Sequence, residues 1–234
     1  MIVLIVRAVI FDFDGPINDS FREGLRRIKI LCAIHNVRFG REERRRLTEF
    51  WGIPGRELLE QGLEISSELS DAMYVEWEKI DLQQPVPLVP SSKDVLYWLR
   101  RNRFISALLT TRNRENLTDI LERLDLIREF GVISTRQNTS YRKPDPRAFR
   151  FVLETLAEKN QIQKENCIFI GDTPADIEAG RLAEIKTLVV QTGPYLLKHT
   201  LQYPIKLENL LNSIDELPAW LEEHHEEEII YPYD

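Results

Sequence analysis

The spacing of apolar residues changes along the chain and divides it into segments. Residues 8–13 (Ala-Val-Ile-Phe-Asp-Phe) are mainly β-branched and aromatic without a helical period, which predicts a buried strand ending at 12–16. From about 20 to 85, apolar residues recur at intervals of three and four, which predicts about four amphipathic helices and no strand. Prolines within 85–90 then predict a stiff linker out of this helical block.

Strand-like and helix-like patterns alternate after residue 90. Strands are expected over 104–109, 131–134, 167–170 and 187–190, and helices over 92–103, through Leu117–Leu124, through Phe149–Leu156 and over 174–184. Ser92 is the expected N-cap of the first of these helices. Alternation of this kind is typical of βαβ units, which build a parallel sheet with helices on both faces. The sequence therefore predicts an α/β core from 1–16 and 89–234, interrupted by an all-helical insert at 17–88.

Composition and charge exclude several classes of protein. The 234 residues are 43% hydrophobic and 29% charged, as in ordinary globular proteins. A net charge of −7 disfavours a broad face for nucleic acid or an anionic membrane, although a small anionic substrate can still bind in a cleft. The apolar stretch Ile2–Val6 is too short for a membrane span or a signal peptide, and we expect a strand there.

The two cysteines, Cys32 and Cys167, do not suggest a disulfide framework, and a cytoplasmic location fits. The acidic tail, 222–234, is expected to fray. No sequence feature indicates an oligomeric state.

Four short motifs follow predicted strands, at the edge of a parallel sheet where ligands bind. The first, Asp12-Phe13-Asp14-Gly15, offers two carboxylates beside a glycine, which suits a divalent cation that prefers oxygen ligands. Its alternative interpretation is a strand followed by an ordinary Asp-Gly turn. The second, Thr110-Thr111, offers hydroxyls and free amides to an oxyanion or phosphate, or else caps the helix that follows.

The third motif, Arg142-Lys143-Pro144-Asp145-Pro146, fixes a lysine beside prolines, although a solvated lysine ahead of a helix would look the same. The fourth, Gly171-Asp172-Thr173-Pro174-Ala175-Asp176, places two carboxylates one helical turn apart after a buried strand. These carboxylates suit the second half of a metal site, and the alternative role for Asp172 is that of a helix cap. The order of the four motifs along the chain is more specific than any one of them.

Taken together and in this order, the motifs resemble those of the haloacid dehalogenase (HAD) superfamily of phosphohydrolases. The shared features are Asp-x-Asp-Gly, a Thr that ends a hydrophobic strand, a Lys before Pro, and Gly-Asp-Thr-x-x-Asp. The resemblance covers the chain up to about residue 193 and is closest to the phosphoglycolate phosphatase and β-phosphoglucomutase branch. It implies a Rossmann-like core and a helical cap of the C1 type. The cap, residues 17–88, is inserted into the core after the first motif.

The resemblance also implies an activity: hydrolysis of a small phosphorylated metabolite, phosphoglycolate-like or a sugar phosphate. Asp12 is the expected nucleophile, which forms a phospho-aspartate, and Asp14 is the expected general acid and base. Mg²⁺ is the expected cofactor. The metal is expected to be held by Asp12, Asp14, Asp172 and Asp176. Asp14 is expected to bind it through its backbone carbonyl, and Asp176 directly or through water. The phosphoryl group is expected on Thr110, Thr111 and Lys143.

A few positions depart from the pattern or separate its relatives. Pro16 stands where Thr or Val is usual and Thr111 where Asn is common, and neither change removes an essential group. Asp14 favours phosphoryl transfer, because dehalogenases and phosphonate-cleaving members lack it. β-Phosphoglucomutases carry a histidine in the linker after the first motif. Gly24 occupies that place here, which disfavours a mutase without excluding it. A non-catalytic module on the same fold is a further alternative, but it would not need both Asp12 and Asp14.

Substrate choice is expected to depend on the cap. Residues 38–46 include five arginines, which favours a solvated helix face with Glu–Arg pairs over a binding site. The loop Trp51–Arg56 contains Gly and Pro, and family members close such a loop over the substrate. Arg56 is therefore the candidate contact for a carboxylate or second phosphate of the substrate.

Overall fold

Six parallel strands form a single sheet in the computed structural model, which describes residues 5–84, 86–194 and 205–224. The strands are β1 (Ala8–Phe11), β2 (Ile105–Leu109), β3 (Phe130–Ser134), β4 (Cys167–Gly171), β5 (Lys186–Val190) and β6 (Leu210–Leu211). Their order is β3-β2-β1-β4-β5-β6. In β1, Phe11 pairs with Leu108 of β2 on one side and Ile170 of β4 on the other. The residues that follow these three strands are therefore neighbours at one edge of the sheet.

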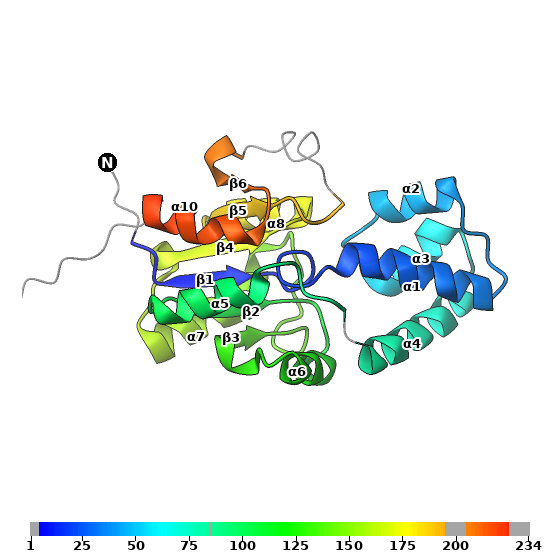
Figure 1. Cartoon of the computed structure of the whole chain (residues 1–234), viewed down its shortest axis with the longest axis horizontal. Helices are drawn as coiled ribbons and strands as arrows, with labels where there is room; N and C mark the ends of the chain where they lie inside the picture. The colour runs from blue at the N-terminus through cyan, green and yellow to red at the C-terminus, as the bar shows by residue number, and fades with distance from the viewer. Residues whose placement is uncertain (1–4, 85, 195–204, 225–234) are drawn as a thin grey trace, which may run out of the picture.

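Helices cover both faces of the sheet (Figure 1). One face carries α5 (Ser92–Arg101), α6 (Arg114–Arg123) and α10 (Leu217–His224), and the other carries α7 (Arg150–Asn160) and α8 (Pro174–Ala183). Short 3-10 turns lie at Ile127–Glu129, Pro146–Phe149, Lys164–Asn166, Leu207–Asn209 and Ile214–Glu216. Val9 and Phe11 pack into the first hydrophobic layer, and Ala8 and Ile10 pack into the second. All of β1 is thus buried, as expected for the centre of a parallel sheet.

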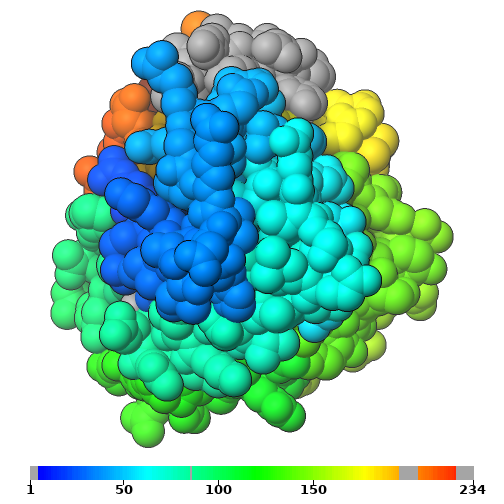
Figure 2. All heavy atoms as spheres, turned by 90° about the vertical axis from the view of Figure 1, so that its right-hand side faces the viewer, coloured from blue at the N-terminus to red at the C-terminus, as the bar shows by residue number. Residues whose placement is uncertain are grey.

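Four helices form a cap between β1 and α5. They are α1 (Ser20–Ile34), α2 (Arg41–Glu49), α3 (Gly55–Leu63) and α4 (Ser67–Gln83). Their inward residues make a hydrophobic cluster of their own, which includes Leu31, Leu47, Leu59 and Met73. The cap lies at one end of the core, and Figure 2 shows it from that end with the core behind it.

The two chain crossings between core and cap lie side by side. Asn18 and Leu88 form an isolated antiparallel bridge, and the Asp19 amide donates to the Pro87 carbonyl at 2.8 Å. On the core side of this bridge, Ile17 is packed in the same hydrophobic cluster as β1. The cap is therefore joined to the core by two short segments of backbone that lie next to each other.

The predicted α/β fold is confirmed, and the strands predicted after residue 90 agree with the observed ones within a residue or two at each end. The two-residue strand β6 was not predicted. Two expectations were wrong. Ile5 and Val6 carry no strand, while the rest of 2–6 lies outside the described residues. Ser91 rather than Ser92 is the N-cap of α5, because the Ser92 hydroxyl donates to the Ile17 carbonyl (3.0 Å).

In the tail, residues 222–224 belong to α10 rather than fraying, and 225–234 lie outside the described residues. Cys32 and Cys167 are both buried free thiols. Within the described ranges, no helix combines the length and apolar character needed to cross a bilayer.

Candidate active site

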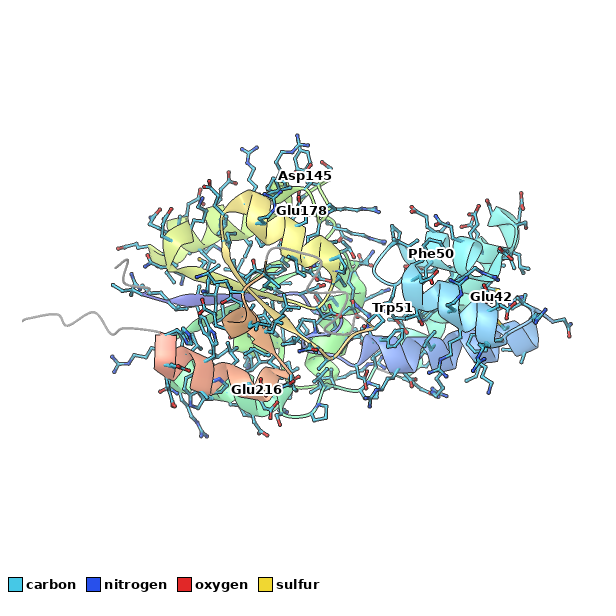
Figure 3. All side chains as sticks on the ribbon, turned by 90° about the horizontal axis from the view of Figure 1, so that it is seen from above. Glu42, Phe50, Trp51, Asp145, Glu178 and Glu216 are labelled. Carbon is cyan, nitrogen blue, oxygen red and sulfur yellow. The ribbon has the colours of Figure 1, made fainter. Side chains whose placement is uncertain are left out.

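The strand ends bring the sequence motifs together at the sheet edge that faces the cap. Asp12 follows β1, Thr110 follows β2 and Asp172 follows β4, while Lys143 comes from the loop after β3. A pocket of about 230 Å³ lies where this edge meets the cap, and residues of both parts line it. Figure 3 shows Trp51 of the cap at this junction.

Three carboxylates converge at this edge. Asp12, Asp172 and Asp176 each offer one oxygen, and the three atoms lie within 4.8 Å of one another. The Oδ1 atom of Asp172 is buried and has no hydrogen-bond partner among the described residues. Gly15 has a φ of +103° and packs so closely that a Cβ there would lie 2.2 Å from Asp172 Cγ. Buried carboxylate oxygens, one of them without a hydrogen-bond partner among the described residues, are suitable ligands for a hard divalent cation such as Mg²⁺.

Lys143 bridges two of these carboxylates, with Nζ 2.7 Å from Asp12 Oδ2 and 2.6 Å from Asp176 Oδ1. Burial raises the pKa of Asp12 to about 7, with the charges of Asp176 and Asp14 adding to the rise and Lys143 opposing it. Burial and the charges of Asp176, Asp12 and Asp14 hold the pKa of Asp172 well above its usual range, although Lys143 opposes them. Burial lowers the pKa of Lys143, but the charges of Asp12 and Asp176 outweigh it, so the amine stays protonated. One ammonium does not balance these carboxylates, and a second cation would let all of them ionise.

Asp176 also has a structural task. Its Oδ2 accepts hydrogen bonds from the backbone amides of Asp172 (3.2 Å) and Thr173 (3.0 Å) and from the Thr173 hydroxyl (2.7 Å). Thr173 is the N-cap of α8, and its Oγ1 accepts from the Asp176 amide. The helix cap considered for Asp172 is therefore made by Thr173, which leaves the Asp172 carboxylate to the site.

Thr110 and Thr111 lie between β2 and α6. Thr110 is buried, and its hydroxyl oxygen accepts from the Arg112 amide at 3.2 Å, so the hydroxyl can still donate. Thr111 lines the pocket. Asn113 caps α6, because its side chain accepts from the Glu115 amide at 2.9 Å. Neither threonine is used as the N-cap, and both remain available to an anion.

Asp14 lies apart from the carboxylate cluster because Arg112 holds it. Nε and Nη2 of Arg112 donate to the two oxygens of Asp14, each at 2.7 Å. Nη1 of the same arginine lies 3.5 Å from Asp81 Oδ2 on cap helix α4. Asp81 in turn pairs with Arg27 of α1, whose side chain is only 1% exposed. A row of alternating charges thus runs from the candidate acid–base residue into the cap.

Arg56 does not lie with the other candidate residues. Its guanidinium pairs with Asp71, lies 5.3 Å from the centre of the Tyr74 ring, and is not part of the pocket lining. The role expected for Arg56 therefore stays a prediction.

The arginine-rich helix α2 is also remote from the pocket. Arg45 pairs with Glu42 and Glu49 at 2.5 Å each, and Figure 3 shows Glu42 on the part of the cap away from the core. This agrees with the interpretation of α2 as a solvated face.

Comparison with known proteins identifies the family. The model of the haloacid dehalogenase-like hydrolases matches residues 9–190, and the chain belongs to this family. This confirms the resemblance stated from the sequence motifs.

Two relatives are similar over most of their length. A phosphoglycolate phosphatase from Aquifex aeolicus is 29% identical over 221 residues, covering 89% of this chain and 98% of the relative. A phosphorylated carbohydrates phosphatase from Thermotoga maritima is 26% identical over 225 residues, covering 91% of this chain and 100% of the relative. Together with the family assignment, they support the predicted enzyme class, a phosphoric monoester hydrolase.

Solved structures share the fold. The structure of CbbY from Rhodobacter sphaeroides in complex with phosphate matches with a TM-score of 0.71 and 20% identity, covering 93% of this chain and 100% of the other. The fold of this chain is therefore one that solved structures also adopt.

Sequence reasoning missed several residues of the pocket. Arg112, Asp81 and Tyr74 were not selected, and Trp77 was seen only as part of an apolar helix face. Arg112 stands directly after the two threonines at the sheet edge, and that position was the available signal. The partnership of Asp81 with a core arginine has no local signal, because it joins the cap to the core.

Proposed function

We propose that the protein is a Mg²⁺-dependent phosphatase that hydrolyses a small phosphorylated metabolite through a phospho-aspartate on Asp12. The observation that carries the proposal is the convergence of Asp12, Asp172 and Asp176 around Lys143, at a pocket between core and cap that Asp12, Asp172 and Lys143 line. A phosphate monoester is a dianion, so a site rich in carboxylates can accept it only with compensating cations. Lys143 supplies one such cation and a divalent metal would supply the other.

The residues that would hold the metal are Asp12 and Asp172, with the Asp14 backbone carbonyl and with Asp176 directly or through water. Mg²⁺ in such a site neutralises charge on the phosphoryl group and on its nucleophile. Because Oδ2 of Asp176 is engaged at the α8 cap and Oδ1 contacts Lys143, an indirect role for Asp176 fits the hydrogen bonding. Among the described residues, Oδ1 of Asp172 has neither a hydrogen-bond partner nor an ion pair like the one between Asp176 Oδ1 and Lys143, which makes Asp172 the stronger candidate for a direct ligand.

In the first step, a carboxylate oxygen of Asp12 attacks phosphorus, the ester P–O bond breaks, and Asp14 gives its proton to the departing alkoxide. In the second step, water attacks the acyl phosphate while Asp14 takes a proton from it, and inorganic phosphate leaves Asp12. Thr110, Thr111 and Lys143 donate to the phosphoryl oxygens in both steps. Arg112 positions Asp14 with one hydrogen bond to each oxygen, which leaves each oxygen a further lone pair for the proton.

The mutase alternative meets an obstacle at position 24. Gly24 lines the pocket, and a Cβ at this position would lie 2.4 Å from the Trp51 ring and 3.3 Å from that of Trp77. A side chain such as histidine would have to displace Trp51, so the position offers no group for the return transfer that a mutase needs. Hydrolysis is therefore the better supported outcome. The non-catalytic alternative is disfavoured because the buried carboxylates and Lys143 are costly unless they serve chemistry.

Phosphate release from p-nitrophenyl phosphate tests the proposal. We expect release with Mg²⁺, loss of at least about 100-fold when the metal is removed with EDTA, and recovery when Mg²⁺ is added back in excess. Full turnover by metal-free protein would refute the metal assignment. Absence of release from this ester and from a panel of phosphorylated metabolites would favour the non-catalytic module.

A further inference from the structure

We infer that the alcohol released from the substrate is uncharged and presents a flat apolar ring face, in contrast to the anionic glycolate that leaves phosphoglycolate. The inference rests on the proposed phosphatase function and concerns the part of the pocket beyond the reacting phosphorus. The relatives' names point to two kinds of leaving group, a hydroxy acid and a carbohydrate. The chemistry of the cap wall separates an anionic leaving group from a neutral one.

The cap side of the pocket is apolar and aromatic. Its larger side chains are Trp51, Ile53, Pro54, Leu58, Tyr74 and Trp77. Among the described residues that line the pocket, none that the cap contributes is Lys or Arg. Glu78 and Asp81, both from α4, are the charged groups that the cap presents there. A carboxylate on the leaving group would therefore face acids and ring faces, both of which repel an anion.

The cations on the core side do not compensate for this wall. Arg112 is engaged by Asp14 and Asp81, and Lys143 is engaged at the reacting centre. Arg136 also lines the pocket, but it is exposed at the rim, where solvent and salt weaken its field. Arg56, the cap arginine that sequence reasoning selected, pairs with Asp71 outside the lining. Nothing in this arrangement offers a leaving-group carboxylate a buried, uncommitted partner among the described residues.

The aromatic rings are fixed by their neighbours. Trp51 packs edge-on against Phe21 with ring centres 5.0 Å apart, and Tyr74 packs against Trp77 with centres 6.5 Å apart. The absence of a side chain at Gly24 lets both tryptophans approach the same point of α1. Rigid ring faces stack on flat apolar groups at little entropic cost, and such contacts add affinity beyond simple burial. The cavity volume of about 230 Å³ restricts the occupant to a small molecule.

Three phosphate esters of primary alcohols test the inference with leaving groups of similar basicity. They are benzyl phosphate, with an uncharged ring; 2-hydroxyethyl phosphate, uncharged without a ring; and phosphoglycolate, its anionic counterpart. We expect kcat/KM for benzyl phosphate to exceed that for 2-hydroxyethyl phosphate by about threefold or more. We expect the latter to exceed phosphoglycolate by about tenfold or more. Equal values for the three esters, or a preference for phosphoglycolate, would overturn the inference.

Variants of the wall separate the charge argument from the ring argument. Glu78→Gln should raise the ratio of kcat/KM for phosphoglycolate over 2-hydroxyethyl phosphate by about threefold or more, because one repelling charge is removed. Glu76→Gln is the matched control, since Glu76 lies on the same helix but pairs with His35 (3.1 Å) outside the pocket. Trp77→Leu should lower the ratio of benzyl over 2-hydroxyethyl phosphate by about threefold or more. Unchanged ratios in both variants, with unfolding temperatures near that of the parent, would contradict the inference.

The failure of the inference and the failure of the proposed function give different results. If p-nitrophenyl phosphate is hydrolysed with Mg²⁺ but phosphoglycolate is the best of the three esters, only the leaving-group assignment is wrong. If none of these esters releases phosphate with Mg²⁺ present, the phosphatase proposal fails and the inference fails with it.

Discussion

Asp12 is the residue on which the covalent route depends. We predict that Asp12→Asn lowers kcat by at least about 10⁴-fold, because an amide is a poor nucleophile toward phosphorus and cannot form the acyl phosphate. The variant should remain folded, since it replaces a carboxyl whose pKa burial already raises to about 7. Turnover of p-nitrophenyl phosphate measures the loss, and intact-mass spectrometry checks for deamidation. If a sample shown to contain no deamidated protein still turns over at the parent rate, a phospho-aspartate on Asp12 is excluded.

Asp14 should matter in proportion to the basicity of the leaving group. We predict that Asp14→Asn lowers kcat/KM for benzyl phosphate by about 10²–10⁴-fold, because the alkoxide needs a proton as it departs. The loss for p-nitrophenyl phosphate should be at least about tenfold smaller, since p-nitrophenolate leaves without one. Parallel assays on the two esters measure the difference. The same loss on both would mean that Asp14 acts by holding Arg112 or the metal rather than by proton transfer.

The predictability of the site differed from residue to residue for physical reasons. The common location of Asp12, Thr110 and Asp172 could be predicted because each follows a recognisable buried strand, and strand ends converge in a parallel sheet. Arg112 follows the same strand end, but its contact with Asp14, 98 positions away in the chain, could not be predicted from that position. Arg56 was selected because it belongs to a cap segment that contains Gly and Pro. Such a loop sequence does not say which way a long side chain points.

At the scale of elements, Asp81 on helix α4 forms ion pairs with Arg27 of the cap and Arg112 of the core. Its side chain is 16% exposed and pairs with Arg27, which is 1% exposed. We predict that Asp81→Asn lowers the free energy of unfolding by about 2 kcal/mol, because two arginines lose a charged acceptor. Burial raises the pKa of Asp81 although both arginines oppose it, so the loss comes mainly from the arginines left behind.

Asp71→Asn is the matched control on the same helix. Asp71 pairs with Arg56, and the two side chains are 55% and 53% exposed. Exposed ion pairs contribute little, so this variant should stay within about 0.5 kcal/mol of the parent. Urea unfolding of both variants gives the comparison. Similar effects from the two substitutions would show that the Arg27–Asp81–Arg112 row does not stabilise the junction.

The elements themselves followed from the sequence where the hydrophobic pattern was long. The four-residue strand β1 and the five-residue strand β4 stood out because they are apolar and buried along their whole length, and β2, β3 and β5 because most of their residues are buried. The strand β6 has only two residues and depends on pairing with β5, which a local pattern cannot show. Ser92 failed as an N-cap for a similar reason, since its hydroxyl bonds to Ile17, 75 positions earlier in the chain.

For the whole molecule, total charge and local charge lead to different conclusions. The net charge of −7 argues against broad anionic partners, and the five arginines of 38–46 lie away from the pocket. On the core side of the pocket, Arg112 and Lys143 already pair with carboxylates, whereas the cap side is aromatic and acidic. Its selectivity therefore depends on how the two parts meet, which neither the composition nor any single motif describes.

The carboxylate cluster should also govern how the stability of the whole protein depends on pH and metal. In the folded state the pKa of Asp12 is raised from 3.8 to about 7, and that of Asp172 is raised as well. Between these values the folded protein binds more protons than the unfolded chain. Stability contributed by these groups is thus present below about pH 4 and is lost as pH rises toward and through 7. Each group contributes a slope of up to about 1.4 kcal/mol per pH unit in that window.

Mg²⁺ should reverse this trend, because it takes the place of the protons on the same oxygens. We predict that the rise in unfolding temperature caused by Mg²⁺ is small near pH 5 and grows through pH 7 to 8, relative to samples with EDTA. Asp172→Asn removes one titrating carboxyl and one proposed ligand, so it should flatten the metal-free pH dependence and weaken the response to Mg²⁺. Glu76→Gln, remote from the cluster, should change neither. A Mg²⁺-induced shift that is the same at all these pH values would mean that the metal binds elsewhere on the protein.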